Sequence, residues 1–335
     1  MTLDEIKQAL KSPAYDFLRT DPHLGKRTIM LTVGGSHAYG TNIETSDLDI
    51  RGCTLQSRRE LIGFERFEQV IDNATDTTIY AFNKFISLLI NCNPNIIELL
   101  GNKPEHYLYL SDIGKELVEN RHMFFSQKAI RSFCGYTNQQ LRQLKNATAR
   151  NYREEDVKEQ HLLETIKASM ADLADTTDLL KDGRISVNIQ RVGEKISCSV
   201  NVENYPLREF AKTIKAMANI ASDFDRLSNK PLSKDDAHAG KHAMHLIRLY
   251  CVCIDLLEKG DIFTYREAEH DLLMDIRSGK FQNPDGSYRP EFFEMVNTYE
   301  QRLQYAKENT TLPAKPDYKK IEDFAMHVNE YALAM

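Results

Sequence analysis

The sequence predicts an α+β fold, with a small mixed-sheet core followed by a mostly helical C-terminal domain that carries a β-hairpin. Short apolar segments separated by turn residues fill the first third of the chain, a pattern typical of strands. From about Ser111 onward, apolar residues recur with helical spacing, except over 184–202, where their alternation predicts the hairpin. We therefore expect two domains, residues 1–110 and residues 111–335, with a ligand-binding cleft between them.

The first domain is expected to alternate short helices and strands. Thr2 and Glu5 have the spacing of a capping box, which predicts a helix start there, and Pro13 interrupts that helix. A buried strand over 27–33 is expected to end in a glycine turn at 34–36, followed by a polar loop. The remaining predicted elements are a strand at 47–54, a short helix at 57–62, strands at 67–71 and 76–80, and a helix at 81–90 that ends at Asn93-Pro94.

The second domain is expected to consist of helices joined by short loops. Its predicted helices are 112–121, 126–147, 154–181, 205–228, 236–259, 264–277 and 291–308. The turn of the hairpin is predicted at Val192-Gly193-Glu194, and 283–287 reads as a loop because it contains Asn, Pro, Asp, Gly and Ser.

Composition narrows the class of protein. The chain has 335 residues and a net charge of −6, so nucleic acid would have to bind at a local basic patch and not over the whole surface. Its six cysteines form no Cys-x-x-Cys pair, and the first residues do not resemble a secretory signal. No apolar run approaches the length of a membrane span. We therefore expect a reduced, cytoplasmic protein with no membrane partner.

The segment from Leu31 to Gly52, LTVGGSHAYGTNIETSDLDIRG, carries the clearest chemical signal. Because side chains alternate along a strand, Asp47 and Asp49 are expected to project together while Leu48 and Ile50 face the core. Two adjacent carboxylates beside a glycine turn suit a complex of divalent metal and triphosphate. The acids would hold the cations, and the turn with the Ser36 hydroxyl would hold the phosphates.

This segment resembles the signature of the DNA polymerase β-like nucleotidyltransferases, in which Gly-Ser follows an apolar strand and Asp-x-Asp lies on the next. The wider context resembles a predicted nucleotidyltransferase branch found in bacteria and phages. The resemblance is strongest over 29–101 and returns at 241–249; it is carried by GGSHAYG, SDLDIRG, TDTTIY, NPNIIELL and KHAMHLIRL. It implies a catalytic domain at 1–110, a helical domain that completes the nucleotide cleft, an NTP such as ATP as donor, and Mg²⁺ or Mn²⁺ as cofactor.

The third acid of the signature is assigned here to Asp76. It begins a predicted strand, and the resemblance places the third acid on the strand after the pair. Its role would be metal coordination and general-base action on the acceptor hydroxyl. Asp72 is the competing residue, but it precedes Asn73-Ala74, where an acid more often stabilises a turn.

Groups that would contact the triphosphate come from the glycine turn and from two cationic stretches. Gly35 and Ser36 are the first candidates, although an ordinary tight turn explains the glycines equally simply. Arg51, expected on the same strand face as Asp47 and Asp49, could bind phosphate or pair with one of those acids. A P-loop is excluded because Thr41 stands where that motif requires lysine.

The second cationic stretch lies on the predicted helix 236–259. Lys241, His245 and Arg248 are spaced i, i+4 and i+7, so they share one helix face and could bind the β- and γ-phosphates. The same spacing relates His238, His242 and His245, which leaves a metal site as a rival interpretation. A solvated polar face is the third interpretation.

Three classes of function follow from these residues. The first is a metal-dependent nucleotidyltransferase, with Asp47, Asp49 and Asp76 as metal ligands, that moves an NMP from an NTP to a hydroxyl group of RNA, a protein or a small molecule. The second is a nucleotide-binding regulator or interaction protein of the same fold without turnover. The third is a two-metal nuclease or phosphatase, which the Gly35-Ser36 turn disfavours. Fold-level kinship does not choose the acceptor.

Overall fold

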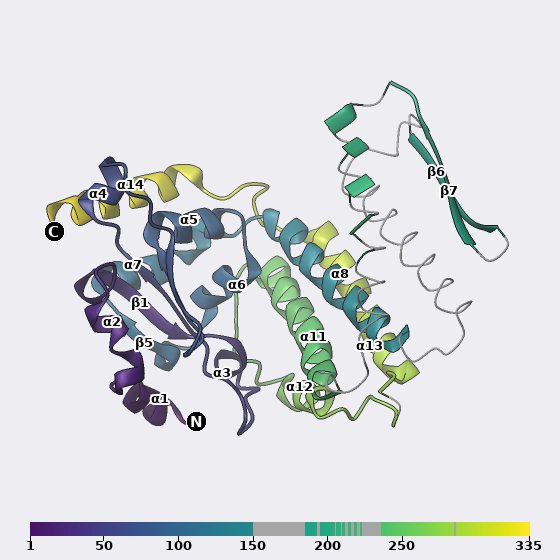
Figure 1. The fold of residues 1–335 in the computed structure, drawn as a ribbon, viewed down its shortest axis with the longest axis horizontal. Helices are drawn as coiled ribbons and strands as arrows, with labels where there is room; N and C mark the ends of the chain where they lie inside the picture. The colour runs from purple at the N-terminus through teal and green to yellow at the C-terminus, as the bar shows by residue number, and fades with distance from the viewer. Residues whose placement is uncertain are drawn as a thin grey trace. The chain divides into compact units, whose positions relative to one another are not determined.

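A computed structural model gives the fold of the chain (Figure 1). It describes residues 1–149, 185–192, 195–204 and 236–335 except 285, together with scattered residues between 206 and 222. The predicted helix 154–181, the turn residues Gly193 and Glu194, and most of the predicted helix 205–228 lie outside the described residues.

The described helices agree with the prediction of a mostly helical second half. Their bounds are α1 Leu3–Ala9, α2 Phe17–Thr20, α3 Gly35–Tyr39, α4 Arg58–Ile62, α5 Phe82–Ile90, α6 Pro94–Ile97, α7 Asp112–Glu119, α8 Lys128–Ala149, α11 Asp236–Lys259, α12 His270–Arg277, α13 Pro290–Asn309 and α14 Tyr318–Ala334.

The strands form two sheets. Five of them, β1 Thr28–Val33, β2 Ile50–Thr54, β3 Gln69–Asp72, β4 Thr77–Ala81 and β5 Tyr107–Leu110, make one sheet in the order β3-β4-β2-β1-β5. In it β2 pairs parallel with β4, whereas the β1–β2, β1–β5 and β3–β4 pairs are antiparallel. The second sheet is the predicted hairpin, formed by β6 Ile185–Val192 and β7 Lys195–Val202. The α+β class with a mixed sheet is therefore confirmed.

The chain divides into two compact units. The first comprises Met1–Tyr136, Ile247–Asp275 and Val296–Met335, and the second comprises Thr137–Leu246 and Ile276–Met295. The division at residue 110 stays a prediction about domains. The first unit contains the whole five-stranded sheet, and the second contains the hairpin.

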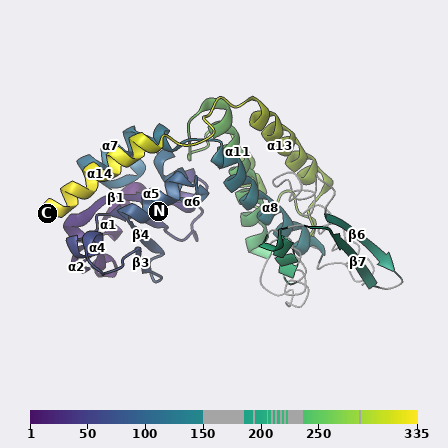
Figure 2. The ribbon, with the colours of Figure 1, turned by 90° about the horizontal axis from the view of Figure 1, so that it is seen from above.

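Helices cover the sheet of the first unit. Helix α5 packs on β2 and β4, and α7 packs on β1 and β5. The contact of α7 is so close that a Cβ atom at Gly114 would lie 2.2 Å from the carbonyl oxygen of Ile29. The C-terminal helix α14 lies against α5, where the rings of Phe82 and Phe324 meet edge to face with centroids 6.0 Å apart (Figure 2).

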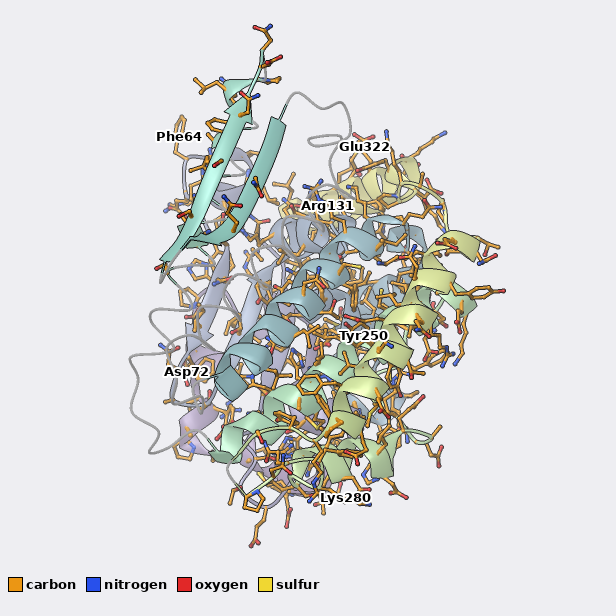
Figure 3. The ribbon with its side chains drawn as sticks, turned by 90° about the vertical axis from the view of Figure 1, so that its right-hand side faces the viewer. Phe64, Asp72, Arg131, Tyr250, Lys280 and Glu322 are labelled. Carbon is orange, nitrogen blue, oxygen red and sulfur yellow. The ribbon has the colours of Figure 1, made fainter. Side chains whose placement is uncertain are left out.

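The later parts of α11 and α13, residues 247–259 and 296–309, belong to the same unit. Tyr250 on α11 is 1% exposed and lies among the packed helices (Figure 3). Its ring stacks on Tyr299 with centroids 6.3 Å apart, and its hydroxyl donates a 3.0 Å hydrogen bond to Glu300. The polar end of this buried ring therefore has a partner.

Some predictions of individual elements need correction. The segment after Gly34 is the helix α3 and not a polar loop. The helix expected to begin at 264 begins at His270. The strand β5 and the helix α14 were not predicted at all.

Candidate functional site

The glycine turn is the start of a short helix. Gly35 has φ +50, which favours glycine. The helix α3 ends at Tyr39 and is followed by Gly40, whose φ of +71 gives a left-handed C-terminal cap. The cap is closed by the amide of Thr41, which donates a 2.9 Å hydrogen bond to the carbonyl oxygen of Ser36. Ser36, named above as a phosphate contact, is 9% exposed within this helix.

Asp49 lies directly against this turn. The amide of Gly34 donates a 2.8 Å hydrogen bond to the carbonyl oxygen of Asp49, so the two segments pair beyond the end of β1. A Cβ atom at Gly35 would lie 1.9 Å from Oδ2 of Asp49, which no real side chain allows. The absence of a side chain at Gly35 is therefore what lets the Asp49 carboxylate sit there.

Asp76 lies beside Asp49 because β2 and β4 are parallel neighbours. Ile50 is in register with Thr77, and its amide donates a 3.2 Å hydrogen bond to the carbonyl oxygen of Asp76. Asp49 and Asp76 thus each lie just before the first residue of a strand, at the same end of two neighbouring strands. The strand predicted to begin at 47 begins at Ile50, and the strand predicted to begin at 76 begins one residue later, at Thr77. Asp76, just before it, has φ +45.

Arg51 joins the two acids. Its Nη2 donates to Oδ1 of Asp49 at 3.0 Å and to Oδ1 of Asp76 at 2.9 Å, so both carboxylates share one nitrogen. Its Nη1 donates to the carbonyl oxygens of Asp76 and Ile50, the latter at 3.0 Å. Of the two possibilities that the sequence leaves open for Arg51, this geometry is the pairing with acids, and it involves Asp76 as well as Asp49.

Asp47 is placed differently from Asp49. Its side chain is exposed and lines a hollow of about 560 Å³ together with Asp76 and the segment 73–75. No three His, Cys, Asp or Glu side chains form a ready-made metal cluster in the part of the chain that the structure describes. Carboxylate oxygens are nevertheless the donors that Mg²⁺ prefers, and Asp49 and Asp76 already share one cation, so this donor set fits a divalent ion.

Asp72, the competitor for the third acid, serves the turn that leads to β4. Its Oδ2 accepts hydrogen bonds from the amide of Thr75 at 2.9 Å and from the hydroxyl of Thr75 at 2.7 Å. This is the local side-chain-to-backbone bonding expected of an acid at a turn.

The far end of α3 rests on a buried polar cluster. The hydroxyl of Tyr39 donates a 2.6 Å hydrogen bond to Glu98, and the guanidinium of Arg248 lies 3.8 Å from the centroid of the Tyr39 ring. All three residues are buried. Burial, followed by the nearby Glu98 carboxylate, raises the pKa of Tyr39 well above its usual range, so this phenol keeps its proton and donates.

The three cationic residues of α11 differ in how exposed they are. Lys241 is exposed and His245 is half-buried, whereas Arg248 is 6% exposed and stacked on Tyr39. Lys241 and His245 belong to the second compact unit and Arg248 to the first. The rival histidine site includes His238, whose side chain lies outside the described residues.

Three residues that support the turn were not singled out by the sequence analysis. Asn102 donates to Thr32 at 2.7 Å and to the carbonyl oxygen of Val33 at 2.9 Å, which fixes the end of β1 before the turn. His270 bonds the carbonyl oxygen of Gly40 at 3.0 Å. Glu98 had a usable signal: a lone acid in the apolar run NPNIIELL is expected to be buried and paired.

Comparisons with known proteins identify the family to which the sequence is similar. Residues 3–178, more than half of the chain, match the model of the RNA repair pathway DNA polymerase beta family. The chain is also 24% identical over 127 residues to an uncharacterized 38.9 kDa protein of enterobacteria phage T4, which is encoded in the nrdC-mobD intergenic region. That alignment covers 34% of this chain and 38% of the phage protein.

No solved structure matches the chain. Among the described helices, none has the length and apolar character needed to cross a bilayer. The family match covers the glycine turn, both acids of the Asp-x-Asp motif, and Asp76. The chain therefore belongs to the RNA repair pathway DNA polymerase beta family, whose members are polymerase β-like nucleotidyltransferases.

Proposed function

We propose that this protein is a metal-dependent nucleotidyltransferase that moves an NMP from an NTP to a hydroxyl group and releases pyrophosphate. The observation that supports this most strongly is the convergence of Asp49 and Asp76 on one cation beside Gly35. The description of its family names an RNA repair pathway, which favours an RNA hydroxyl as the acceptor over a protein or a small molecule.

The reaction assigns a role to each residue of the site. The acceptor oxygen attacks the α-phosphorus, the bond from that phosphorus to the bridging oxygen breaks, and pyrophosphate leaves with the electron pair. Asp76 takes the proton of the acceptor hydroxyl as general base. Asp47, Asp49 and Asp76 hold Mg²⁺ or Mn²⁺, which when bound lowers the pKa of the acceptor hydroxyl and neutralises the triphosphate.

The triphosphate is assigned to the cationic and turn residues named above. Gly35 and Ser36 hold it from the turn, and Arg51 and Arg248 of the same compact unit supply positive charge. For Arg248 the supporting observation is that its Nε, although buried, has no hydrogen-bond partner among the residues that the structure describes. A buried guanidinium donor without a partner costs free energy, and a phosphate oxygen would remove that cost once the side chains that cover this nitrogen move aside.

The test is transfer of label from an α-³²P-labelled NTP to RNA that carries a free 3′-hydroxyl group, with Mg²⁺ or Mn²⁺ present. The wild-type protein is expected to label RNA, and EDTA is expected to abolish the labelling. Asp49→Asn should reduce transfer to background. The matched control is Asp112→Asn, because Asp112 is a fully exposed acid on α7 that pairs with the exposed Lys115.

The other two classes of function predict different results in the same assay. Equal labelling by the wild type and Asp49→Asn would contradict the proposal. If nucleotide binds without release of pyrophosphate, the protein is a nucleotide-binding regulator. Release of nucleotides from RNA without added NTP would instead indicate a nuclease.

A further inference from the structure

We propose that Arg51 is an exchangeable counter-ion of the catalytic acids, which competes with the divalent metal for Asp49 and Asp76 and is released to the triphosphate when the metal binds. The inference rests on the proposed function, because it takes Asp49 and Asp76 as metal ligands. It adds to that function a coupling between metal and nucleotide that passes through one side chain.

The first step of the argument is the geometry of one nitrogen between two carboxylates. Nη2 of Arg51 lies 3.0 Å from Oδ1 of Asp49 and 2.9 Å from Oδ1 of Asp76. Mg²⁺ binds carboxylate oxygens at about 2.0–2.1 Å, so both oxygens would have to move inward by roughly an ångström around an ion. A guanidinium nitrogen and an ion therefore cannot occupy the same position between these two oxygens.

The second step is that the other carboxylate oxygen of Asp49, Oδ2, cannot take the place of Oδ1. Its Oδ2 is turned toward the glycine turn, since a Cβ at Gly35 would lie 1.9 Å from that oxygen. The oxygen turned toward Asp76 is Oδ1, the one that Arg51 binds. A metal shared by Asp49 and Asp76 would need this oxygen, and Arg51 would have to leave it.

The third step concerns charge. Asp49 and Asp76 are held at adjacent positions by the register of β2 and β4, and two carboxylates at such a spacing repel each other unless a cation lies between them. Either Arg51 or a metal ion can supply that cation. Because a triphosphate offers Arg51 new charge-assisted hydrogen bonds, nucleotide lowers the cost of releasing it, and metal and NTP should bind cooperatively.

Arg51 also has an alternative role as a purely structural residue. Its Nη1 bonds to the carbonyl oxygens of Asp76 and Ile50 hold the turn in which Asp76 has φ +45. A structural role and a competing role predict opposite signs for metal affinity. If Arg51 only holds the acids in place, removing it weakens metal binding, whereas removing a competitor strengthens it.

The experiment measures Mn²⁺ binding by electron paramagnetic resonance of the free ion, with the full-length protein and Mn²⁺ alone. Arg51→Met is expected to bind Mn²⁺ about tenfold more tightly than the wild type, the size of effect that loss of one partly buried charge pair gives. Arg66→Met is the matched control, because Arg66 is exposed, and it should leave the affinity unchanged. Asp49→Asn in the Arg51→Met background should remove the gain.

Adding a non-hydrolysable ATP analogue gives a second readout. The analogue should tighten Mn²⁺ binding to the wild type by a larger factor than to Arg51→Met, because only the wild type must release a guanidinium. Arg51→Lys keeps the charge but loses the planar guanidinium group that bonds to several oxygens at once. Its gain in Mn²⁺ affinity over the wild type should be about two- to threefold. This variant decides the question if Arg51→Met does not fold.

The inference is overturned if Mn²⁺ binds Arg51→Met no more tightly than the wild type, or if the gain survives Asp49→Asn. For Arg51→Lys, an affinity no higher than that of the wild type has the same meaning. Failure of the proposed function looks different: in the labelled-NTP assay the wild type and Asp49→Asn would then be equally inactive, whatever the Mn²⁺ affinities are.

Discussion

The guanidinium of Arg248 lies face-on over the ring of Tyr39, with 3.8 Å between its central carbon and the ring centroid. Tyr39 ends the helix α3, which begins at the glycine that contacts Asp49. The first compact unit thus fixes both ends of this five-residue helix, one against the Asp49 carboxylate and the other through a cation–π contact.

The bond between Tyr39 and Glu98 is expected to contribute to stability. Tyr39→Phe removes the donor and leaves the buried Glu98 carboxylate with one hydrogen bond fewer, so the free energy of unfolding should fall by about 1.5–3 kcal/mol. Urea unfolding measures this. Tyr109→Phe, at a ring that is 47% exposed, is the control and should change stability very little. Equal losses of stability in both variants would show that the buried hydrogen bond contributes no more than a hydroxyl group on an exposed ring.

Gly35 is expected to be essential for a different reason. Gly35→Ala would set a methyl group 1.9 Å from Oδ2 of Asp49 at φ +50, so the Asp49 carboxylate must move. We expect at least a hundredfold loss of nucleotidyl transfer, in line with the effect of displacing a catalytic group by about 1 Å. Gly260→Ala isolates the backbone cost, because Gly260 has φ +67 and open space where its Cβ would lie. That variant should be less stable by about 1 kcal/mol with unchanged transfer.

Substitutions at Asp72 and Asp76 should have different effects, the first on stability and the second on nucleotidyl transfer. Asp76→Asn removes a proposed metal ligand and general base, and should abolish transfer. Asp72→Asn weakens the hydrogen bonds to Thr75, and should lower stability by about 1 kcal/mol while transfer persists. Transfer assays and urea unfolding on the same two proteins give the comparison. The reverse pattern would make Asp72 the third acid of the site.

His106 should make stability depend on pH. Burial lowers the pKa of this imidazole in the folded protein, with only a partial opposing effect from Glu105. The unfolded chain therefore takes up a proton at a higher pH than the folded one, so stability is full above about pH 6.5 and falls as the pH drops below it, by at most about 1.4 kcal/mol per pH unit.

His106→Gln should flatten this dependence between pH 7 and pH 5, as measured by urea unfolding at several pH values. The control is His327→Gln, because His327 is exposed on α14 and should leave the slope as it is in the wild type. A slope unchanged by His106→Gln would mean that another group titrates in this range.

Local patterns in the sequence were sufficient for much of the fold. Alternating residues predicted the hairpin β6–β7, and the helical period predicted the bounds of α11. The helix α14 has an amphipathic pattern in the sequence, since Ile321, Phe324 and Val328 are spaced i, i+3 and i+7 and are all buried. The strand β5 has four residues and pairs only with β1 among the described strands, so its existence depends on a distant partner.

The sequence was sufficient to name residues of the candidate site, but not to predict how they contact one another. Motif spacing grouped Asp47, Asp49 and Asp76, yet it could not indicate that Arg51 bonds to two of them, because that contact depends on the register of β2 with β4. Helix periodicity placed Arg248 on a face with Lys241 and His245. It could not show that Arg248 is buried on Tyr39, since Tyr39 comes from a distant part of the chain.

The parallel pairing of β2 with β4 has a consequence for how this protein can vary. Because Asp49 and Asp76 precede neighbouring strands at the same end of the sheet, the connection over 55–68, which includes α4, only has to span the distance from β2 back to the hairpin β3–β4. Insertions in this connection would lengthen it without separating Asp49 from Asp76. A single residue deleted within β4 would shift its register, and Asp76 would no longer meet its neighbour. Diversity among relatives should therefore collect in that connection.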